Sequence, residues 1–129
     1  MRLLLDTHVL IWMRNNDARL SRAKWEPVFL DPDNEILFSV VSLWEIAIKR
    51  ALGKLALEGG LTDFARQLED QHGFSMLPLE GSALDRLDKL PPHHGDPFDR
   101  LLIAQAIEEG AVAITNDRNW LRYAVKTRW

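Results

Sequence analysis

Short apolar runs alternate along the chain with longer stretches in which apolar residues recur at the spacing of a helix. The first run, Leu3–Leu5, is apolar at every position and ends at Asp6, as a buried parallel strand does. Later runs of similar length indicate further strands. The predicted strands are residues 3–5, 35–39, 74–77, 111–115 and, at a sheet edge, 125–127.

The helices are indicated by their caps as well as by their periodicity. Ser21 and Thr62 are good N-caps, and Gly53 suits the position that follows a helix end. Asp96 followed by Pro97 is a strong helix start, because Asp caps the first turn and Pro is favoured at its first position. The predicted helices are residues 7–15, 21–30, 42–52, 62–73, 80–90, 97–110 and a short 118–123.

The alternation of strands with helices predicts an α/β fold, with a mainly parallel central sheet and helices on both faces. The 129 residues suit a single domain that covers residues 1–129. A chain of this length buries roughly two-thirds of its unfolded surface, so it needs no disulfide or structural metal to hold it together. We find no repeat, low-complexity tract or interdomain linker.

Composition narrows the setting in which the chain works. Cysteine is absent, which excludes disulfides and thiolate metal sites and suits the cytoplasm. No run approaches the roughly 18 apolar residues of a membrane span, and Asp6 and His8 break the apolar start, so we expect neither a membrane segment nor a signal peptide. The net charge of −3 argues against holding nucleic acid by bulk charge, although a metal or a local basic patch would still allow an RNA substrate.

Five acids, far apart in the sequence, are expected to meet at one edge of the sheet. Ligands of an open parallel sheet bind beyond the carboxyl ends of its strands, where the crossover helices also begin. The first strand ends at Asp6, and two residues after the fourth strand comes Asp117. Glu45 falls in the first turn of the helix after the second strand, and Asp96 and Asp99 open the helix before the fourth strand.

Two of these acids occupy positions that are unusual for a solvated charge. At helical spacing Asp99 falls on the apolar side of its helix, which carries Leu102, Ile103, Ala106 and Ile107. Glu45 belongs to the only polar stripe of its helix, together with Ser42 and Lys49. A carboxylate in apolar surroundings is costly unless it is paired or binds metal.

A cation among these acids is the simplest explanation, because several close carboxylates cannot all stay charged without one. Oxygen ligands favour Mg²⁺ or Mn²⁺ over zinc, and no His/Cys cluster has zinc-ligand spacing. Ions held by acids are suited to phosphodiester cleavage. The predicted metal ligands are Asp6, Glu45, Asp96, Asp99 and Asp117.

Each residue also has a purely structural interpretation. Asp96 and Asp99 can cap their helix, Asp117 can form a turn, and Glu45 can pair with Lys49 at i,i+4. It is the convergence of the acids that favours function. Near them Lys49, Arg100 and Arg118 are candidates for guiding RNA, or else they are solvated or paired with the acids.

The histidines and tryptophans are given structural roles. The adjacent pair His93 and His94 is expected to be solvated rather than ligating, and His8 to hydrogen-bond locally. The tryptophans are expected in the core or at interfaces. The first two helices carry more large apolar residues than one core readily uses, which indicates a partner groove unless they close the core: Ile11, Trp12, Trp25, Phe29 and Leu30.

Four segments resemble the motifs of the PIN-domain family, in order and over nearly the whole chain: LLLDTHVLIW, SVVSLWEIAIK, DPFDRLLIAQA and ITNDRNW. The length and the third segment are most similar to VapC-type toxins of toxin–antitoxin pairs. The resemblance implies a PIN-like three-layer fold over residues 1–129, RNA cleavage that depends on Mg²⁺ or Mn²⁺, a homodimer, and inhibition by a small antitoxin.

Carried onto this chain, the catalytic acid quartet falls on Asp6, Glu45, Asp99 and Asp117, and Asp96 matches a further acid of the third motif. The supporting polar residues are Thr7, Ser42, Thr115 and Asn116.

Other functions remain open. A PIN nuclease could process RNA without a toxin role, or a PIN-like module could bind RNA or protein without catalysis. A haloacid-dehalogenase-like phosphatase would need an acid at position 8, where this chain has His8.

Overall fold

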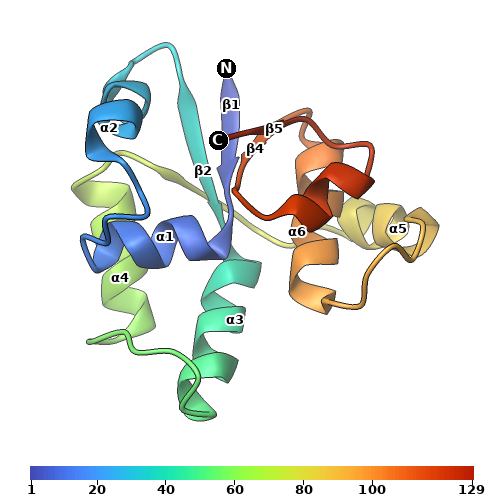
Figure 1. The fold of residues 1–129 in the computed structure, drawn as a ribbon, viewed down its shortest axis with the longest axis horizontal. Coiled ribbons are helices and arrows are strands. Elements are labelled where there is room, and N and C mark those ends of the chain that lie inside the picture. Colours follow the sequence, from blue (N-terminus) through green and yellow to red (C-terminus); the bar gives the residue numbers. More distant parts are fainter.

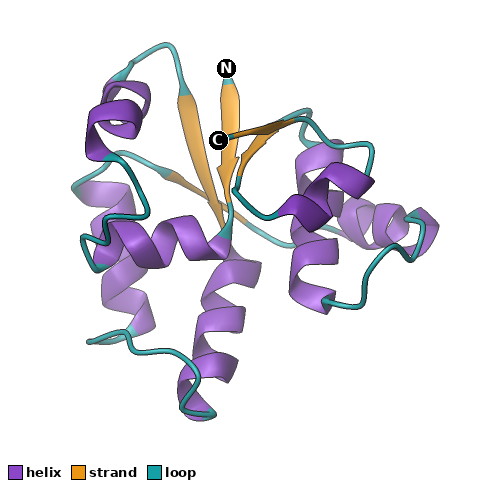
Figure 2. Cartoon of the chain, in the orientation of Figure 1, coloured by secondary structure: helices purple, strands orange, loops and turns teal.

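A five-stranded sheet, parallel throughout, forms the centre of the computed structural model, which describes all residues 1–129 (Figures 1 and 2). The strand order is β3-β2-β1-β4-β5. The α/β fold expected from the alternating pattern is confirmed. The strands are β1 (Arg2–Leu5), β2 (Glu35–Ser39), β3 (Ser75–Leu77), β4 (Val112–Ile114) and β5 (Thr127–Arg128).

Helices connect the strands and cover both faces of the sheet (Figure 1). None of them combines the length and the apolar character that crossing a membrane requires. The helices are α1 (Thr7–Arg14), α2 (Arg22–Leu30), α3 (Val40–Ala51), α4 (Leu61–Asp70), α5 (Gly81–Lys89) and α6 (Pro97–Glu108), and a short 3₁₀ helix, η1 (Arg118–Arg122), follows β4.

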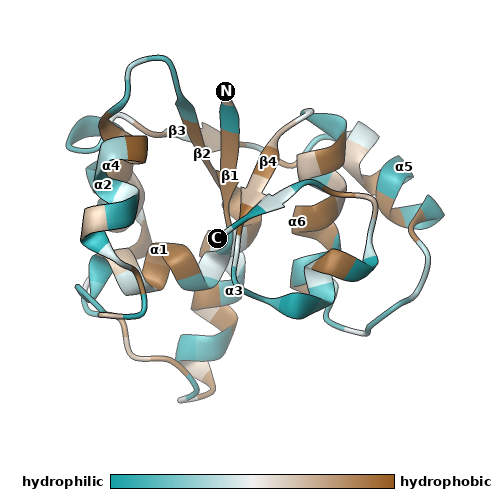
Figure 3. Ribbon diagram, turned by 45° about the horizontal axis from the view of Figure 1, so that its top comes forward, coloured by the Kyte–Doolittle hydropathy of each residue, from teal (hydrophilic) through white to brown (hydrophobic).

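The central strand β1 divides the core into two halves, because successive side chains of a strand point to opposite faces. Leu3 and Leu5 pack in one cluster with residues of α1, α2 and α4. Leu4 packs in the other, which α6 and η1 close. Figure 3 shows these strands as the apolar centre between helices with polar outer faces. A strand buried on both sides explains the uninterrupted apolar run in the sequence.

Several predicted boundaries are wrong by one to a few residues, among them those of α3, α4 and β5. Helix α3 begins at Val40, directly after β2, with the Ser39 hydroxyl accepting a hydrogen bond from the N–H of Val41. Glu45 therefore lies in the second turn of α3 and not in the first. Gly60, not Thr62, precedes α4, and β5 covers Thr127–Arg128 instead of 125–127.

The expectation of unused apolar surface on the first two helices is largely wrong. Ile11, Trp12 and Trp25 are buried in the core, and Phe29 packs against it; of the five, only Leu30 is strongly exposed, at 73%. A hollow of about 300 Å³ remains between α1 and α2, and Trp12, Trp25 and Phe29 contribute to its walls. Most of these side chains therefore close the core, which was the alternative interpretation.

The topology places the site at the carboxyl ends of β1 and β4. From β1 the chain first builds β2 and β3 on one side and then returns to build β4 and β5 on the other. Loops that leave neighbouring strands in opposite directions open a crevice at such a switch point. The backbone N–H of Asp6 donates to the carbonyl of Ile114 at 3.0 Å, which extends the β1–β4 pairing into the first residue of the candidate site.

Candidate active site

Asp6 and Thr115 join the ends of the two central strands. The Thr115 hydroxyl donates to Oδ2 of Asp6 at 2.7 Å and accepts from the backbone N–H of Asp117 at 3.1 Å. Asp6 and Thr115 are buried, with 2% and 4% of their surface exposed. The Thr115 hydroxyl thus fixes the rotamer of Asp6 and the turn that carries Asp117.

The start of α6 holds the next two acids in different ways. Oδ1 of Asp96 accepts from the N–H groups of Phe98 and Asp99, at 2.9 and 3.0 Å, so this carboxylate caps the helix as predicted. Asp99 makes no such cap and is buried, with 6% of its surface exposed. The sequence placed Asp99 on the apolar face of its helix, and this face does point into the interior of the protein.

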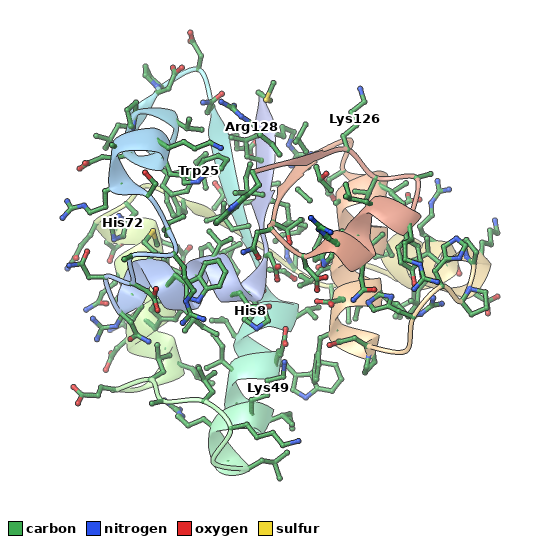
Figure 4. All side chains as sticks on the ribbon, in the orientation of Figure 1. His8, Trp25, Lys49, His72, Lys126 and Arg128 are labelled. Atoms are coloured by element: carbon green, nitrogen blue, oxygen red, sulfur yellow. The ribbon has the colours of Figure 1, made fainter.

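Glu45 reaches the site from α3 with a lysine beside it. Nζ of Lys49 donates to Oε2 of Glu45 at 2.5 Å, and the carboxylate is buried with 1% of the residue exposed. On the preceding turn, the hydroxyls of Thr7 and Ser42 form a buried hydrogen bond of 2.9 Å that ties α1 to α3. The predicted pairing of Lys49 with Glu45 is confirmed. Figure 4 shows Lys49 on α3 and His8 near the start of α1.

Two carboxylate oxygens of this cluster are buried without a hydrogen-bond partner: Oδ1 of Asp6 and Oε1 of Glu45. Buried acceptors in proteins are almost always satisfied, so an unpaired carboxylate oxygen requires a reason. A cation is the natural partner for both. His8 does not fill this role for Asp6, because its Nδ1 lies 3.9 Å from Oδ1 and half of its side chain is exposed.

The acids act on one another electrostatically. Burial raises the pKa of Asp99 to about 8, and the negative charges of Asp6, Asp96, Asp117 and Glu45 add to the effect. The pKa of Asp6 is also raised, mainly by burial and further by Glu45, although the Thr115 hydrogen bond opposes the shift. The four other acids of the predicted set thus all lie within electrostatic reach of Asp99.

The donor set fits Mg²⁺ or Mn²⁺, since it offers carboxylate oxygens only, two of them buried and unpaired. The acids are neighbours but remain too far apart to coordinate one ion as they stand, because no three of them form a ready group of metal ligands.

Asp117, Asn116 and Arg118 lie at the outer rim of the cluster. The Asp117 carboxylate caps η1, accepting from the N–H of Asn119 at 2.9 Å. Asn116 is exposed and its side chain makes no hydrogen bond, while Arg118 is exposed and forms no ion pair. Asp117 is only partly buried, which leaves it room to turn toward a ligand.

Arg100 lies apart from this rim and is engaged by the loop before α6. Its guanidinium donates to the carbonyls of Pro91 and Leu90 and to the hydroxyl of Tyr123. Arg100 forms no ion pair with an acid of the cluster. It is therefore neither solvated nor paired with the acids, the two structural roles expected for it. The contacts give Arg100 a role in holding the loop.

The expectation that His94 is solvated is wrong. Only 11% of its side chain is exposed, its Nδ1 lies 2.7 Å from the Tyr123 hydroxyl, and its Nε2 lies 3.4 Å from Oδ2 of Asp99. A proline-rich loop typically lies at the surface, which misled the interpretation. The available signal was the short distance in sequence between His94 and the helix cap at Asp96.

The chain is similar to known proteins over nearly its whole length. The profile of the PIN domain matches residues 3–126. Ribonuclease VapC22 of Mycobacterium tuberculosis is 30% identical over 116 residues, which cover 89% of this chain and 86% of that protein.

Two solved structures share the fold. VapBC2 from Rickettsia felis, bound to a DNA fragment from its promoter, superposes with a TM-score of 0.75 at 16% identity, covering 99% of this chain and 98% of the other. VapBC-1 from nontypeable Haemophilus influenzae superposes with a TM-score of 0.67 at 18% identity, covering 99% of this chain and 97% of the other. By its profile match and its likeness to VapC22, the chain belongs to the PIN-domain family, among the VapC ribonucleases.

Proposed function

We propose that this chain is a ribonuclease that depends on Mg²⁺ or Mn²⁺ and hydrolyses RNA phosphodiester bonds, as the toxin of a toxin–antitoxin pair. The observation that carries the proposal is the cluster of buried acids in which Asp6 and Glu45 each keep an unpaired carboxylate oxygen. RNA is the substrate that the name of VapC22 supports, and an antitoxin is the partner that the VapBC structures support.

In this proposal Asp6, Glu45, Asp99 and Asp117 hold the cation, and Asp96 contributes from the helix cap. When bound, the cation supplies positive charge to the phosphate oxygens and makes an attacking water more acidic. Thr115 holds the Asp6 carboxylate in place, and the Thr7–Ser42 hydrogen bond keeps α1 and α3 in register. His94 lies beside Asp99, with its Nε2 3.4 Å from Oδ2 of that carboxylate.

The antitoxin is proposed to bind the hollow between α1 and α2. Its wall is partly aromatic, with Trp12, Trp25 and Phe29, and charged residues such as Arg22 and Glu26 also line it. A peptide segment with large apolar side chains suits such a groove. The groove shares Trp12 with the helix that follows Asp6, so a segment lying in it can extend a basic side chain toward the acids.

A homodimer is proposed through α3. Trp44 and Ile48 on this helix, and Leu52 directly after it, recur at i, i+4 and i+8 and are 52%, 42% and 63% exposed. An exposed apolar stripe of this kind commonly marks a protein interface. This stripe is separate from the hollow between α1 and α2, where the antitoxin is proposed to bind.

A cleavage assay on the purified chain with Mg²⁺ tests the proposal. Asp99→Asn is expected to lower the cleavage rate by at least about 100-fold, the scale of losing one catalytic electrostatic group. Asp96→Asn keeps the helix cap and should lose less activity. Asp63→Asn, at an exposed acid of α4, is the matched control and should leave the rate unchanged.

Activity near the wild-type level in Asp99→Asn under saturating Mg²⁺ would contradict the metal site. Binding of RNA with no cleavage under any divalent cation would favour a non-catalytic module. Cleavage without harm to the host, and without a neighbour-encoded inhibitor, would favour RNA processing instead of a toxin role.

A further inference from the structure

Lys49 is the one lysine or arginine that forms an ion pair with an acid of the cluster. The two side chains differ sharply in burial, since 31% of Lys49 but only 2% of the Glu45 side chain is exposed. An exposed i,i+4 pair contributes little to stability, because water screens both charges. Here one partner is buried, so the attraction is screened far less.

The influence on Lys49 extends beyond Glu45. Burial lowers the pKa of Lys49, but the hydrogen bond to Glu45 and the charges of Glu45, Asp96 and Asp99 outweigh it, so that the pKa is raised. Acids of both α3 and the start of α6 thus hold this ammonium charged. It lies in the same negative potential that would attract a divalent cation.

We propose that Lys49 is an internal counter-ion of the acid cluster, which competes with the divalent cation and leaves Glu45 when that cation binds. This inference rests on the proposed metal site. Lys49 occupies Oε2 of Glu45, while Oε1 of the same carboxylate is buried and unpaired. A cation that binds Glu45 therefore meets a positive charge on the same group, and the two repel.

The side chain of Lys49 allows the exchange. Its ammonium stands on a flexible four-carbon stem, and the side chain already reaches solvent at one end. After leaving Glu45 the ammonium remains beside the site, where it can meet a phosphate of the RNA. The same lysine would then stabilise the metal-free protein and contact the substrate of the loaded one.

A static role for Lys49 predicts the opposite effect on metal binding. If the lysine only held Glu45 in its rotamer, removing it would disorder the carboxylate and weaken the metal site. If it competes, removing it strengthens the metal site. The sign of the change in Mn²⁺ affinity therefore separates the two roles without any measurement of catalysis.

The test is Mn²⁺ titration calorimetry on the full chain without RNA. Lys49→Met keeps the apolar stem and removes the charge, and it is expected to bind Mn²⁺ at least about tenfold tighter than wild type. Lys49→Gln is the second variant, because it keeps a hydrogen-bond donor and folds more safely. Lys54→Met removes the same charge from an exposed lysine just beyond α3 and should change the affinity by less than about twofold.

Melting of the metal-free proteins gives a second readout. Lys49→Met should melt at a lower temperature than wild type, since it leaves Glu45 buried without its partner, and Mn²⁺ should reverse the loss. Equal or weaker Mn²⁺ binding in both Lys49 variants, with binding by wild type, would overturn the inference alone. A wild-type protein that shows no saturable Mn²⁺ binding would overturn the proposed metal site and this inference together.

Discussion

At the scale of single residues, the site is built from carboxylates whose charge the protein opposes. Asp99 is buried and faces four other acids, and Asp6 is buried with one oxygen unpaired. Both therefore hold a proton more tightly when folded than when unfolded. In metal-free protein such groups destabilise the fold as they ionise, and a cation removes the penalty.

The stability of the metal-free protein should consequently depend on pH through Asp99. The pKa of Asp99 rises from roughly 4 in the unfolded chain to about 8 in the folded protein. The stability that protonated Asp99 contributes to the fold is therefore fully present below about pH 4 and is lost as the pH rises toward 8. Asp99→Asn removes this loss. The variant should melt above wild type at pH 8 in a chelator, by a margin that shrinks toward pH 5.

Calorimetric melting in EDTA from pH 5 to 8 checks this. Adding Mn²⁺ at pH 8 should raise the melting temperature of wild type more than that of Asp99→Asn. If the difference in melting temperature between wild type and Asp99→Asn stayed constant with pH, Asp99 would ionise like a solvated acid, and the effect of its burial on its pKa would be contradicted.

Single residues also show where the sequence suffices and where it does not. Asp99 is identifiable from one property, a carboxylate at the helical spacing of an apolar face, and the structure buries it there. The burial of His94 could not be identified in the same way, because its partner Tyr123 is distant in sequence and is brought to it by the fold. Local spacing carries no information about such contacts from distant segments.

At the scale of elements, the two arginines that directly follow cluster acids have different surroundings. Arg100 in α6 donates to the Leu90 and Pro91 carbonyls and to Tyr123, which engages its guanidinium. Arg118, at the start of η1, is exposed and forms no ion pair. Only the second is free to contact a phosphate without breaking contacts of the fold.

Substituting each arginine by alanine should separate these roles. Arg118→Ala is expected to weaken RNA binding and to flatten its dependence on log salt by about 0.7, the value for one phosphate contact on a single strand. Arg100→Ala should lower the melting temperature and leave that slope nearly unchanged. Filter binding at several salt concentrations measures the slopes, and a larger change in Arg100→Ala would reverse the assignment.

The boundary error at the start of α3 has a physical reason. Ser39 ends β2 and also caps α3, so one residue serves both elements and no turn separates them. The β-branched Val40 and Val41 that follow look like a continuation of the strand in the sequence. Tertiary packing decides in favour of helix, since Val41 is buried against α6 and the neighbouring strands.

At the scale of the whole molecule, the sheet order brings the acids together, and the surface offers two places for partners. One is the hollow between α1, the helix that follows Asp6, and α2. The other is the apolar stripe of Trp44, Ile48 and Leu52 along α3 and its end. The topology was predictable in kind from the alternation of strands and helices. The position of the surface stripe was not predictable, because it depends on which faces of the helices remain outside the core.

Inhibition by the antitoxin should respond to metal. If a basic side chain of the antitoxin enters the acid cluster from the hollow, it satisfies the same carboxylates as the cation, and inhibition should weaken as Mg²⁺ rises. The complex should also melt above the free chain. Co-expression with the adjacent reading frame, followed by light scattering and cleavage assays over a Mg²⁺ series, measures both. Inhibition that is independent of Mg²⁺ would place the antitoxin away from the acids.

The proposed activity depends above all on a divalent cation held by the buried acids. A crystal grown with saturating Mn²⁺, and measured for the anomalous signal of manganese, tests it most directly. We expect a peak within about 2.0–2.3 Å of carboxylate oxygens of the cluster, with Asp6 and at least one of Glu45, Asp99 and Asp117 as ligands. Occupied manganese sites elsewhere, with none at these acids although the crystallised protein still cleaves RNA, would contradict it.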